Sequence, residues 1–323
     1  MEKEVLLEAR NLKKYFPVKS NVLDKSKSVV KAVDDISLKV FKGETLGIVG
    51  ESGCGKSTLG RLLIRLLEPT SGEIFYEGKD ITYKSNKQLR TYRQKFQMVF
   101  QDPYSSLNPR MSIGKIIEEP LINFQKGSAI DRRKTVEELL DVVGLPKNSI
   151  HRFPHEFSGG QRQRVGIARA LALNPKLIIA DEPVSALDVS VQSQVLNLLK
   201  DIQKEFNLTY MFISHDLSVV DHLCDRIAVM YLGKIVEISP KKKFYKKSYH
   251  PYSQALLSAI PQPDPKSKRE RIILSGDVPS PSNPPKGCPF HPRCFKAMEV
   301  CKEVTPRLKE MGTNRHVACH LYE

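Results

Sequence analysis

The stretch from Gly50 to Thr58 holds the residue types that bind the phosphates of a nucleotide. It reads G-E-S-G-C-G-K-S-T and fits the pattern G-x-x-x-x-G-K-S. Its glycines let successive backbone N–H groups turn toward the β- and γ-phosphates. Lys56 supplies a point charge for the same phosphates, and the Ser57 hydroxyl is a ligand for Mg²⁺. The residues expected to contact ATP or Mg²⁺ here are Gly50, Ser52, Gly53, Cys54, Gly55, Lys56, Ser57 and Thr58.

The residues on either side predict the strand and the helix that such a loop needs. Residues 45–49 form a short apolar run typical of a buried strand, and leucines recur at helical spacing from Leu59 to Leu67. Strand, glycine-rich loop and helix in that order are the setting of a phosphate-binding loop. For the motif alone, an ordinary glycine-rich turn is the alternative.

Polar residues also end three further strand-like runs: Gln101, the pair Asp181 and Glu182, and His215. Strands that alternate with helical patterns predict a mainly parallel sheet with helices on both faces. Chemistry gathers at the carboxyl ends of the strands in such a sheet. We therefore expect these side chains to lie near the phosphate loop.

Each of these polar residues has a predicted use beside a triphosphate. Asp181 is expected to bind Mg²⁺ directly or through water, and Glu182 is placed to orient water and accept its proton. Gln101 is predicted to contact Mg²⁺ and the attacking water. The alternatives are a helix N-cap for the acids and a turn-forming residue for Gln101.

The composition fits a globular protein of one large domain with an appendage, or of two domains. The chain has 323 residues, of which 40% are hydrophobic. It has no apolar run of about 18 residues that would suggest a transmembrane helix. The N-terminus leads into a strand-like segment without the form of a signal peptide, so we expect a cytoplasmic protein.

The net charge of +15 is compatible with nucleic acid, with an anionic membrane surface, or with a solvated basic surface partly directed at ATP. The chain has no Trp, and no basic stripe is interleaved with aromatic residues. We therefore predict that it binds no nucleic acid.

Further motifs give the chain a resemblance to the nucleotide-binding subunits of ABC transporters. The residues similar to the ABC signature are Ser158, Gly159, Gly160 and Gln161, with Phe157 where leucine is commonest. Residues 250–257 and 276–281, with a cysteine-rich end, are similar to the C-terminal extension of oligopeptide/dipeptide importer ATPases. The resemblance covers residues 5–240 as an ABC ATPase, and residues 249–320 sharpen it.

The resemblance implies an α/β fold, namely a P-loop NTPase with a RecA-like core and an antiparallel β subdomain. It adds an ABC helical subdomain at residues 104–174 and a Cys-rich C-terminal extension. It places the ATPase domain at residues 1–240 and the extension at residues 241–323.

The resemblance also implies roles for single residues. Phe16 stands where the family stacks an aromatic ring on adenine, with Tyr15 as its rival, and Asp188 stands in the D-loop. His215 is expected to contact the γ-phosphate, and the signature closes on the ATP of a partner subunit. The catalytic residues implied are Glu182 as general base, with His215, Gln101 and Lys56.

The partners implied are two membrane permease subunits at the cytoplasmic face of the cell membrane, a second ATPase subunit in a homodimer or heterodimer, and indirectly an extracytoplasmic solute-binding protein. The expected function is energy coupling for oligopeptide or dipeptide import, with nickel or short sugars as alternative solutes. A non-transport ABC-type ATPase that acts on nucleic acid or the ribosome is the other alternative. It is disfavoured because the chain has one cassette and a short insert.

A cysteine cluster near the C-terminus predicts a metal site. It consists of Cys288, Cys294, Cys301 and Cys319, spaced C-x5-C-x6-C-x17-C. In a cytosolic chain, clustered cysteines indicate a metal more than disulfides. Four thiolates suit either a structural Zn²⁺ or a [4Fe–4S] cluster. The resemblance favours the [4Fe–4S] cluster, with Zn²⁺ and uncommitted thiols as alternatives.

Overall fold

The computed structural model describes residues 3–18, 29–260, 271–312 and 314–323. Its chain forms two compact units. The first takes in the N-terminal residues up to Phe41 together with Thr45–Tyr83 and Ile213–Glu323, and the second takes in Lys42–Glu44 and Lys84–Phe212. The phosphate loop and the C-terminal extension thus share one unit. The domain boundary at residue 240 stays a prediction.

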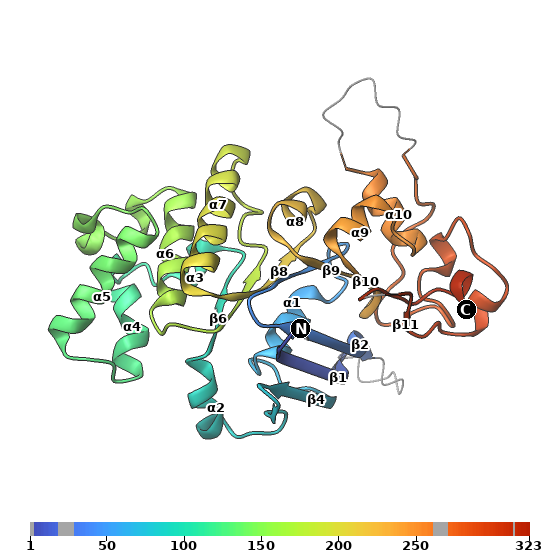
Figure 1. Cartoon of the computed structure of the whole chain (residues 1–323), viewed down its shortest axis with the longest axis horizontal. Coiled ribbons are helices and arrows are strands. Elements are labelled where there is room, and N and C mark those ends of the chain that lie inside the picture. Colours follow the sequence, from blue (N-terminus) through green and yellow to red (C-terminus); the bar gives the residue numbers. More distant parts are fainter. Residues whose placement is uncertain (1–2, 19–28, 261–270, 313) are drawn as a thin grey trace. The chain divides into compact units, whose positions relative to one another are not determined.

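The first unit contains an antiparallel sheet, which confirms the predicted antiparallel β subdomain. Its strand order is β2-β1-β4-β5 (Figure 1). The strands are β1 (Val5–Pro17), β2 (Val29–Phe41), β4 (Ser71–Tyr76) and β5 (Lys79–Asp80). Burial alternates along β2 between Ile36 and Val40, as expected for a strand with one solvated face.

A second sheet of the first unit carries the phosphate loop. Its order here is β11-β12-β10-β9-β3. The strands are β3 (Thr45–Val49), β9 (Arg226–Tyr231), β10 (Lys234–Pro240), β11 (Lys309–Glu310) and β12 (His316–Val317). Strand β3 is wholly buried and runs parallel to β9, whereas β12 pairs antiparallel with β10. Residues near the C-terminus therefore extend the same sheet.

Helix α1 (Lys56–Leu63) follows the phosphate loop and is shorter than predicted. The prediction was wrong for residues 64–67, because Arg65 takes a left-handed conformation with φ of 56°. Its guanidinium donates to the carbonyl oxygens of Ile81 at 3.2 Å and Leu67 at 3.3 Å, which fixes a turn in place of another helical turn. The other helices of this unit are α8 (Leu217–Leu223), α9 (Lys241–Lys246), α10 (Pro251–Ser258), α11 (Val300–Glu303) and the short 3₁₀ helices His291–Arg293 and His320–Tyr322.

The second unit combines three strands, in the order β8-β7-β6, with a group of helices. The strands are β6 (Phe96–Val99), β7 (Leu177–Asp181) and β8 (Thr209–Ser214), and the last two residues of β8 belong to the first unit. The helices are α2 (Asn86–Arg93), α3 (Pro103–Ser106), α4 (Ile113–Asn123), α5 (Ala129–Val142), α6 (Gly159–Leu171), α7 (Val189–Phe206) and the 3₁₀ helices Lys147–His151 and Pro154–Glu156. Helices α4, α5 and α6 pack on one another in the range predicted to be helical (Figure 1).

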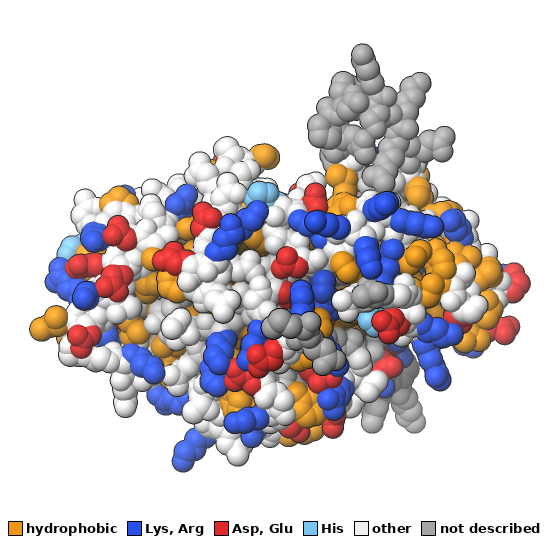
Figure 2. All heavy atoms as spheres, viewed as in Figure 1, with side chains coloured by type: hydrophobic (Ala, Val, Ile, Leu, Met, Phe, Trp, Pro, Cys, Tyr) orange, Lys and Arg blue, Asp and Glu red, His pale blue; other side chains and the backbone are white. Residues whose placement is uncertain are grey.

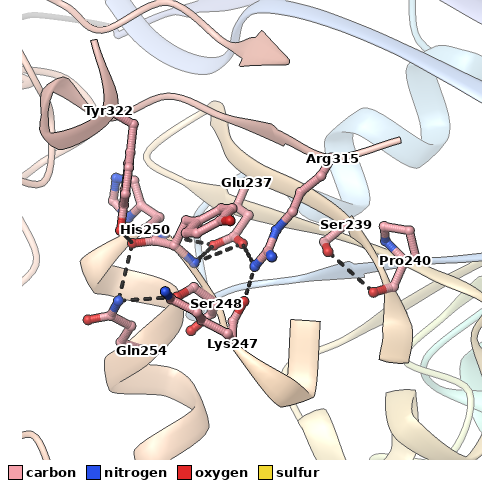
Figure 3. Close-up of polar contacts among 10 residues, drawn as sticks. Glu237, Ser239, Pro240, Lys247, Ser248, His250, Gln254, Arg315 and Tyr322 are labelled. Atoms are coloured by element: carbon pink, nitrogen blue, oxygen red, sulfur yellow. Dashed lines mark hydrogen bonds and ion pairs between the residues drawn. The ribbon is translucent and has the colours of Figure 1, made fainter. Parts of the chain in front are cut away.

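A buried carboxylate ties the C-terminal extension to strand β10. Glu237 is fully buried and accepts hydrogen bonds from the backbone N–H of Tyr249 at 3.0 Å and of His250 at 2.9 Å (Figure 3). The guanidinium of Arg315 lies 3.3 Å from the same carboxylate. A buried charge is tolerated when it is paired and hydrogen-bonded in this way. Glu237 therefore fixes the start of α10 and the segment around Arg315 to the sheet.

The surface of the described residues is rich in charge. None of the helices within the described residues is long and apolar enough to cross a membrane. On the face drawn in Figure 2, Lys and Arg side chains are interspersed with Asp and Glu. Hydrophobic side chains gather at the end of that face where the C-terminal segment lies. Phe295, Val300 and Val304 of this segment are exposed.

Candidate active site

The phosphate loop between β3 and α1 depends on glycine at two positions. A Cβ atom on Gly55 would lie 2.0 Å from the carbonyl oxygen of Ala32, and one on Gly50 would lie 2.1 Å from that of Met230. The backbone therefore admits no side chain at either position. A Cβ on Gly53 would meet no atom within 4 Å. The loop is thus tightly packed on one side and open at Gly53, as a cradle for a ligand must be.

Lys56 lies against its own loop. It is only 5% exposed, and its ammonium donates to the carbonyl oxygens of Gly50 at 2.8 Å and Glu51 at 3.0 Å. Bound phosphate would offer the ammonium charged acceptors, which are stronger than carbonyls. Helix α1 begins at Lys56 with Gly55 as its N-cap and no side-chain cap. The N–H groups of its first turn therefore suit an anion.

Gln101 and Glu182 meet in the second unit. The amide Nε2 of Gln101 donates to a carboxylate oxygen of Glu182 at 3.0 Å. Strands β6 and β7 are parallel neighbours, so residues that follow their ends fall at one edge of the sheet. Asp181, the last residue of β7, is 2% exposed. The sequence predicted this grouping from the strand ends alone.

The backbone of Glu182 is strained. Its φ is 47°, which residues other than glycine seldom adopt. Strain of this kind costs about 1–3 kcal/mol and tends to persist where a side chain must be held in a set direction for function. Pro183 follows directly and is buried, which limits how far the backbone of Glu182 can relax.

The signature residues begin helix α6. Ser158 is the N-cap, and its hydroxyl accepts from the N–H of Gln161 at 3.3 Å, while the Gln161 side chain accepts from the N–H of Ser158 at 3.0 Å. This reciprocal pair is a capping box, which fixes where the helix starts. Phe157 is buried and lies under the guanidinium of Arg152, 4.5 Å from the ring centroid.

The two signature glycines allow close packing inside the second unit. A Cβ on Gly160 would come within 2.3 Å of Val191 on α7, and one on Gly159 within 3.2 Å of Leu187. The start of α6 therefore lies against the segment that holds Asp188, the exposed residue at the N-cap position of α7. The structure thus brings the predicted signature and D-loop residues together.

The remaining predicted residues lie in the first unit. The hydroxyl of Tyr15 donates to Asp34 at 2.5 Å, which commits Tyr15 to a structural contact. Phe16 is half-buried near the end of β1, with the Lys14 ammonium 5.1 Å from its ring centroid. The stacking of Phe16 on adenine stays a prediction. His215 is exposed directly after β8.

Sequence reasoning missed the partners of Glu51, the second residue of the phosphate loop. The guanidinium of Arg293 makes two contacts with its carboxylate, at 2.8 and 3.1 Å. The hydroxyl of Tyr252 accepts from its backbone N–H at 2.9 Å. No motif or periodicity links these three positions in the sequence. The similarity of residues 250–257 to the importer extension marked the neighbourhood of Tyr252 but not its use.

The four cysteines of the cluster near the C-terminus are reduced and partly buried. All four of its thiols are free, and the Cys288 N–H donates to the carbonyl oxygen of Cys301 at 2.8 Å. Burial raises the pKa of Cys288 to about 12 and that of Cys319 to about 11. Within the described part of the chain, no three His, Cys, Asp or Glu side chains are grouped as ligands of one metal ion. The metal site at the cysteine cluster, and the choice between [4Fe–4S] and Zn²⁺, therefore stay predictions.

Comparison with known proteins identifies the family. The family model described as "ABC transporter" matches residues 33–185, and that described as "Oligopeptide/dipeptide transporter, C-terminal region" matches residues 236–301. The chain is 57% identical over 322 residues to the oligopeptide transport ATP-binding protein AppF of Bacillus subtilis, covering 99% of this chain and 98% of that protein. It belongs to the ABC transporter ATP-binding proteins of the oligopeptide/dipeptide family.

A second relative and a solved structure support the same family assignment. The dipeptide transport ATP-binding protein DppF of Haemophilus influenzae is 52% identical over 318 residues, which are 98% of this chain and 97% of that protein. The dimeric cassette MJ0796 bound to ADP and Pi is similar in structure, with a TM-score of 0.65, 30% identity, and coverage of 73% of this chain and 99% of that one. The predicted ABC cassette fold is confirmed.

Proposed function

We propose that this ABC protein hydrolyses ATP to drive the import of oligopeptides or dipeptides. Its similarity to AppF and DppF, together with the C-terminal region at residues 236–301, supports peptide transport. The observation that carries the hydrolytic role is the contact of Gln101 with Glu182 at 3.0 Å, directly after the buried acid Asp181. A carboxylate held by an amide beside a second acid is suited to orienting water for attack on a phosphate.

Each predicted residue has a proposed role toward ATP. Lys56 and the N–H groups of the phosphate loop hold the phosphates, and Phe16 stacks on the adenine. Ser57, Asp181 and Gln101 would hold Mg²⁺, which neutralises phosphate charge when bound. Glu182 orients water and accepts its proton, while His215 contacts the γ-phosphate. Phosphoryl transfer asks little covalent chemistry of the protein, so positioning and charge provide the catalysis.

The remaining wall of the site comes from a second subunit. Ser158 caps the start of α6, and the exposed N–H groups at that helix end suit the γ-phosphate held by a partner. The similar cassette MJ0796 is a dimer in its structure, which supports this arrangement. The pair, a homodimer or a heterodimer, works beneath two permease subunits at the cytoplasmic face of the membrane, supplied by an extracytoplasmic binding protein. ATP then favours the closed pair, and hydrolysis removes the contact that holds it closed.

Substitution of the general base tests the proposal. We expect Glu182→Gln to lower the rate of ATP hydrolysis about 100-fold or more, because an amide cannot accept the proton from water. Binding of ATP should persist, and the variant should accumulate as an ATP-bound dimer in size-exclusion chromatography. Glu205→Gln, which changes an exposed acid on α7, is the matched control and should keep wild-type turnover. Normal hydrolysis by Glu182→Gln would show that the assignment of Glu182 is wrong.

For the cysteine cluster we propose a [4Fe–4S] centre with a structural role. Besides burial, Cys294, Cys301 and Cys319 each raise the pKa of Cys288, which puts the four thiols in one neighbourhood. Iron, sulfide and zinc analysis of the purified full chain should find iron and sulfide in equal amounts. One zinc per chain without sulfide would overturn the proposal.

A further inference from the structure

We infer that Arg293 and Tyr252 of the C-terminal extension are positioning residues for the phosphate loop, which cancel the charge of Glu51 and hold its backbone for nucleotide. The inference rests on the proposed ATP-binding function and extends it to a segment outside the matched cassette. Arg293 and Tyr252 lie beyond residue 185, where the match to the ABC transporter model ends.

Glu51 is held by all three of its polar groups. Its N–H donates to the Tyr252 hydroxyl at 2.9 Å, its carbonyl oxygen accepts from Lys56 at 3.0 Å, and its carboxylate takes both contacts from Arg293. A two-point contact between guanidinium and carboxylate fixes orientation as well as distance. Two of the three groups are thus held by the extension and one by the loop itself.

The negative charge of Glu51 is unfavourable inside a loop that binds phosphate. An unpaired carboxylate beside the phosphates would repel them, and the repulsion is strong where water is partly excluded. The carboxylate of Glu51 is 28% exposed and Arg293 is 9% exposed, so solvent screens this pair only in part. A guanidinium stays charged at neutral pH. The pair therefore presents no net charge to the nucleotide.

Packing of the extension explains why Arg293 and Tyr252 reach the loop. The ring of Phe290 is fully buried and lies 5.2 Å from the ring of Tyr231 and 5.3 Å from that of Tyr252, between centroids. Arg293 ends the 3₁₀ helix that starts directly after Phe290. Tyr252 is placed by the start of α10, which Glu237 fixes through the backbone of His250 (Figure 3).

This arrangement makes nucleotide binding depend on the cysteine-rich segment. Arg293 precedes Cys294 directly, and Cys288 lies before the same 3₁₀ helix. Any change that displaces this helix withdraws the guanidinium from Glu51. The affinity for nucleotide should therefore report whether the segment is folded.

Calorimetric titration of the full chain with Mg²⁺ and a non-hydrolysable ATP analogue tests the inference. Arg293→Met leaves Glu51 unpaired, so Kd should rise about tenfold or more. The double variant Glu51→Gln/Arg293→Met has no unpaired charge, and its Kd should return to within about threefold of the wild-type value. Tyr252→Phe keeps the ring and loses one hydrogen bond, so its Kd should rise roughly threefold.

Lys302→Met is the matched control, because Lys302 is a cation of the same segment that pairs with Glu299 at 2.8 Å and not with Glu51. The Kd of Lys302→Met should be unchanged.

Equal losses of affinity in Arg293→Met and the double variant would overturn the charge role of Arg293. Normal binding by both Arg293→Met and Tyr252→Phe would overturn the whole inference. If the wild-type chain itself bound no analogue, the proposed function would fail first and the inference with it. If Arg293→Met does not fold, Arg293→Lys replaces it, because lysine keeps the positive charge but cannot make the two-point contact with the carboxylate. A Kd equal to that of the wild type would then count against the two-point contact.

Discussion

Glycine at position 55 is required by the backbone of the phosphate loop. Its φ is 104°, and a Cβ would meet the Ala32 carbonyl oxygen at 2.0 Å. Gly55→Ala therefore combines backbone strain with a clash, and we expect it to lower the free energy of unfolding by more than about 2 kcal/mol. Nucleotide binding should be lost as well, because the loop must move to relieve the clash. Urea unfolding and calorimetric titration measure the two effects.

Gly166 provides the control for that substitution. It lies inside helix α6, where a Cβ would meet no atom within 4 Å. Gly166→Ala should raise the free energy of unfolding by about 0.5–1 kcal/mol, because alanine loses less backbone entropy in a helix. A destabilisation equal to that of Gly55→Ala would show that loss of glycine, and not its setting, causes the effect.

At the scale of single residues, the sequence predicted a contact at one sheet edge but not a contact made by the C-terminal extension. The meeting of Gln101 with Glu182 follows from two strand ends, since parallel strands deliver their last residues to one edge. The pairing of Glu51 with Arg293 joins positions 242 residues apart, and no motif or periodicity links them. Such a contact depends on how the extension packs, which pattern reasoning does not reach. The roles of the catalytic and nucleotide-binding residues stay predictions until they are measured.

Among the elements, helix α10 has a titratable cap. The Nδ1 atom of His250 accepts from the N–H of Tyr252 at 3.1 Å, which requires a neutral ring. Burial lowers the pKa of His250 to about 3. In the unfolded chain the imidazole takes up a proton below the ordinary histidine pKa of about 6.5, whereas in the folded chain it stays neutral until a much lower pH. The contribution of His250 to the free energy of unfolding is therefore fully present above pH 6.5 and falls as the pH drops below it.

The free energy of unfolding should fall by about 1.4 kcal/mol for each unit that the pH is lowered between roughly 6 and 4. Denaturant unfolding at pH 7.5 and 5.5 measures it against His250→Asn, which keeps a good cap without a titrating ring. The variant should show a smaller loss over the same interval. The same pH dependence in both proteins would assign the effect to other groups.

Most elements followed from the pattern of apolar residues. Strands β3 and β7 are buried along their whole length, as continuous apolar runs predict for central parallel strands. The end of α1 was wrong because Arg65 turns the chain through contacts with Ile81 and Leu67, and leucine spacing carries no sign of such a contact. Hydrophobic periodicity locates an element well, whereas side-chain hydrogen bonds decide where it ends.

At the scale of the whole molecule, the C-terminal extension is part of the phosphate-loop unit. It adds β12 to the edge of β10, is tied to β10 by Glu237, and holds the loop through Glu51. The sequence marked the extension by its change in composition and by its motifs. It did not predict that the same segment would pack on the loop, because composition shifts suggest a boundary and not a shared core.

The proposed sharing of each ATP between two subunits leads to a complementation experiment. Lys56→Met removes the phosphate contact of one chain. Ser158→Asp keeps an N-cap for α6, because aspartate caps well, but directs a negative charge at the partner's ATP. Each variant alone should hydrolyse ATP far below the wild-type rate. In a mixed dimer, one site combines both defects and the other combines the intact loop of the Ser158→Asp chain with the intact signature of the Lys56→Met chain.

An equal mixture should therefore recover about a quarter of wild-type activity, because half of the dimers are mixed and each carries one intact site of two. The measurement is steady-state phosphate release from the two purified chains, apart and combined, at one total concentration. Recovery is possible only if loop and signature act across the subunit boundary, since neither variant holds both in working form. The mixture could stay as inactive as each variant alone while both variants remain folded and dimeric. In that case either the signature contacts the ATP of its own chain, or the working pair needs a different second subunit. Titration with a candidate second ATPase subunit separates those two outcomes, because only the heterodimer would regain activity with it.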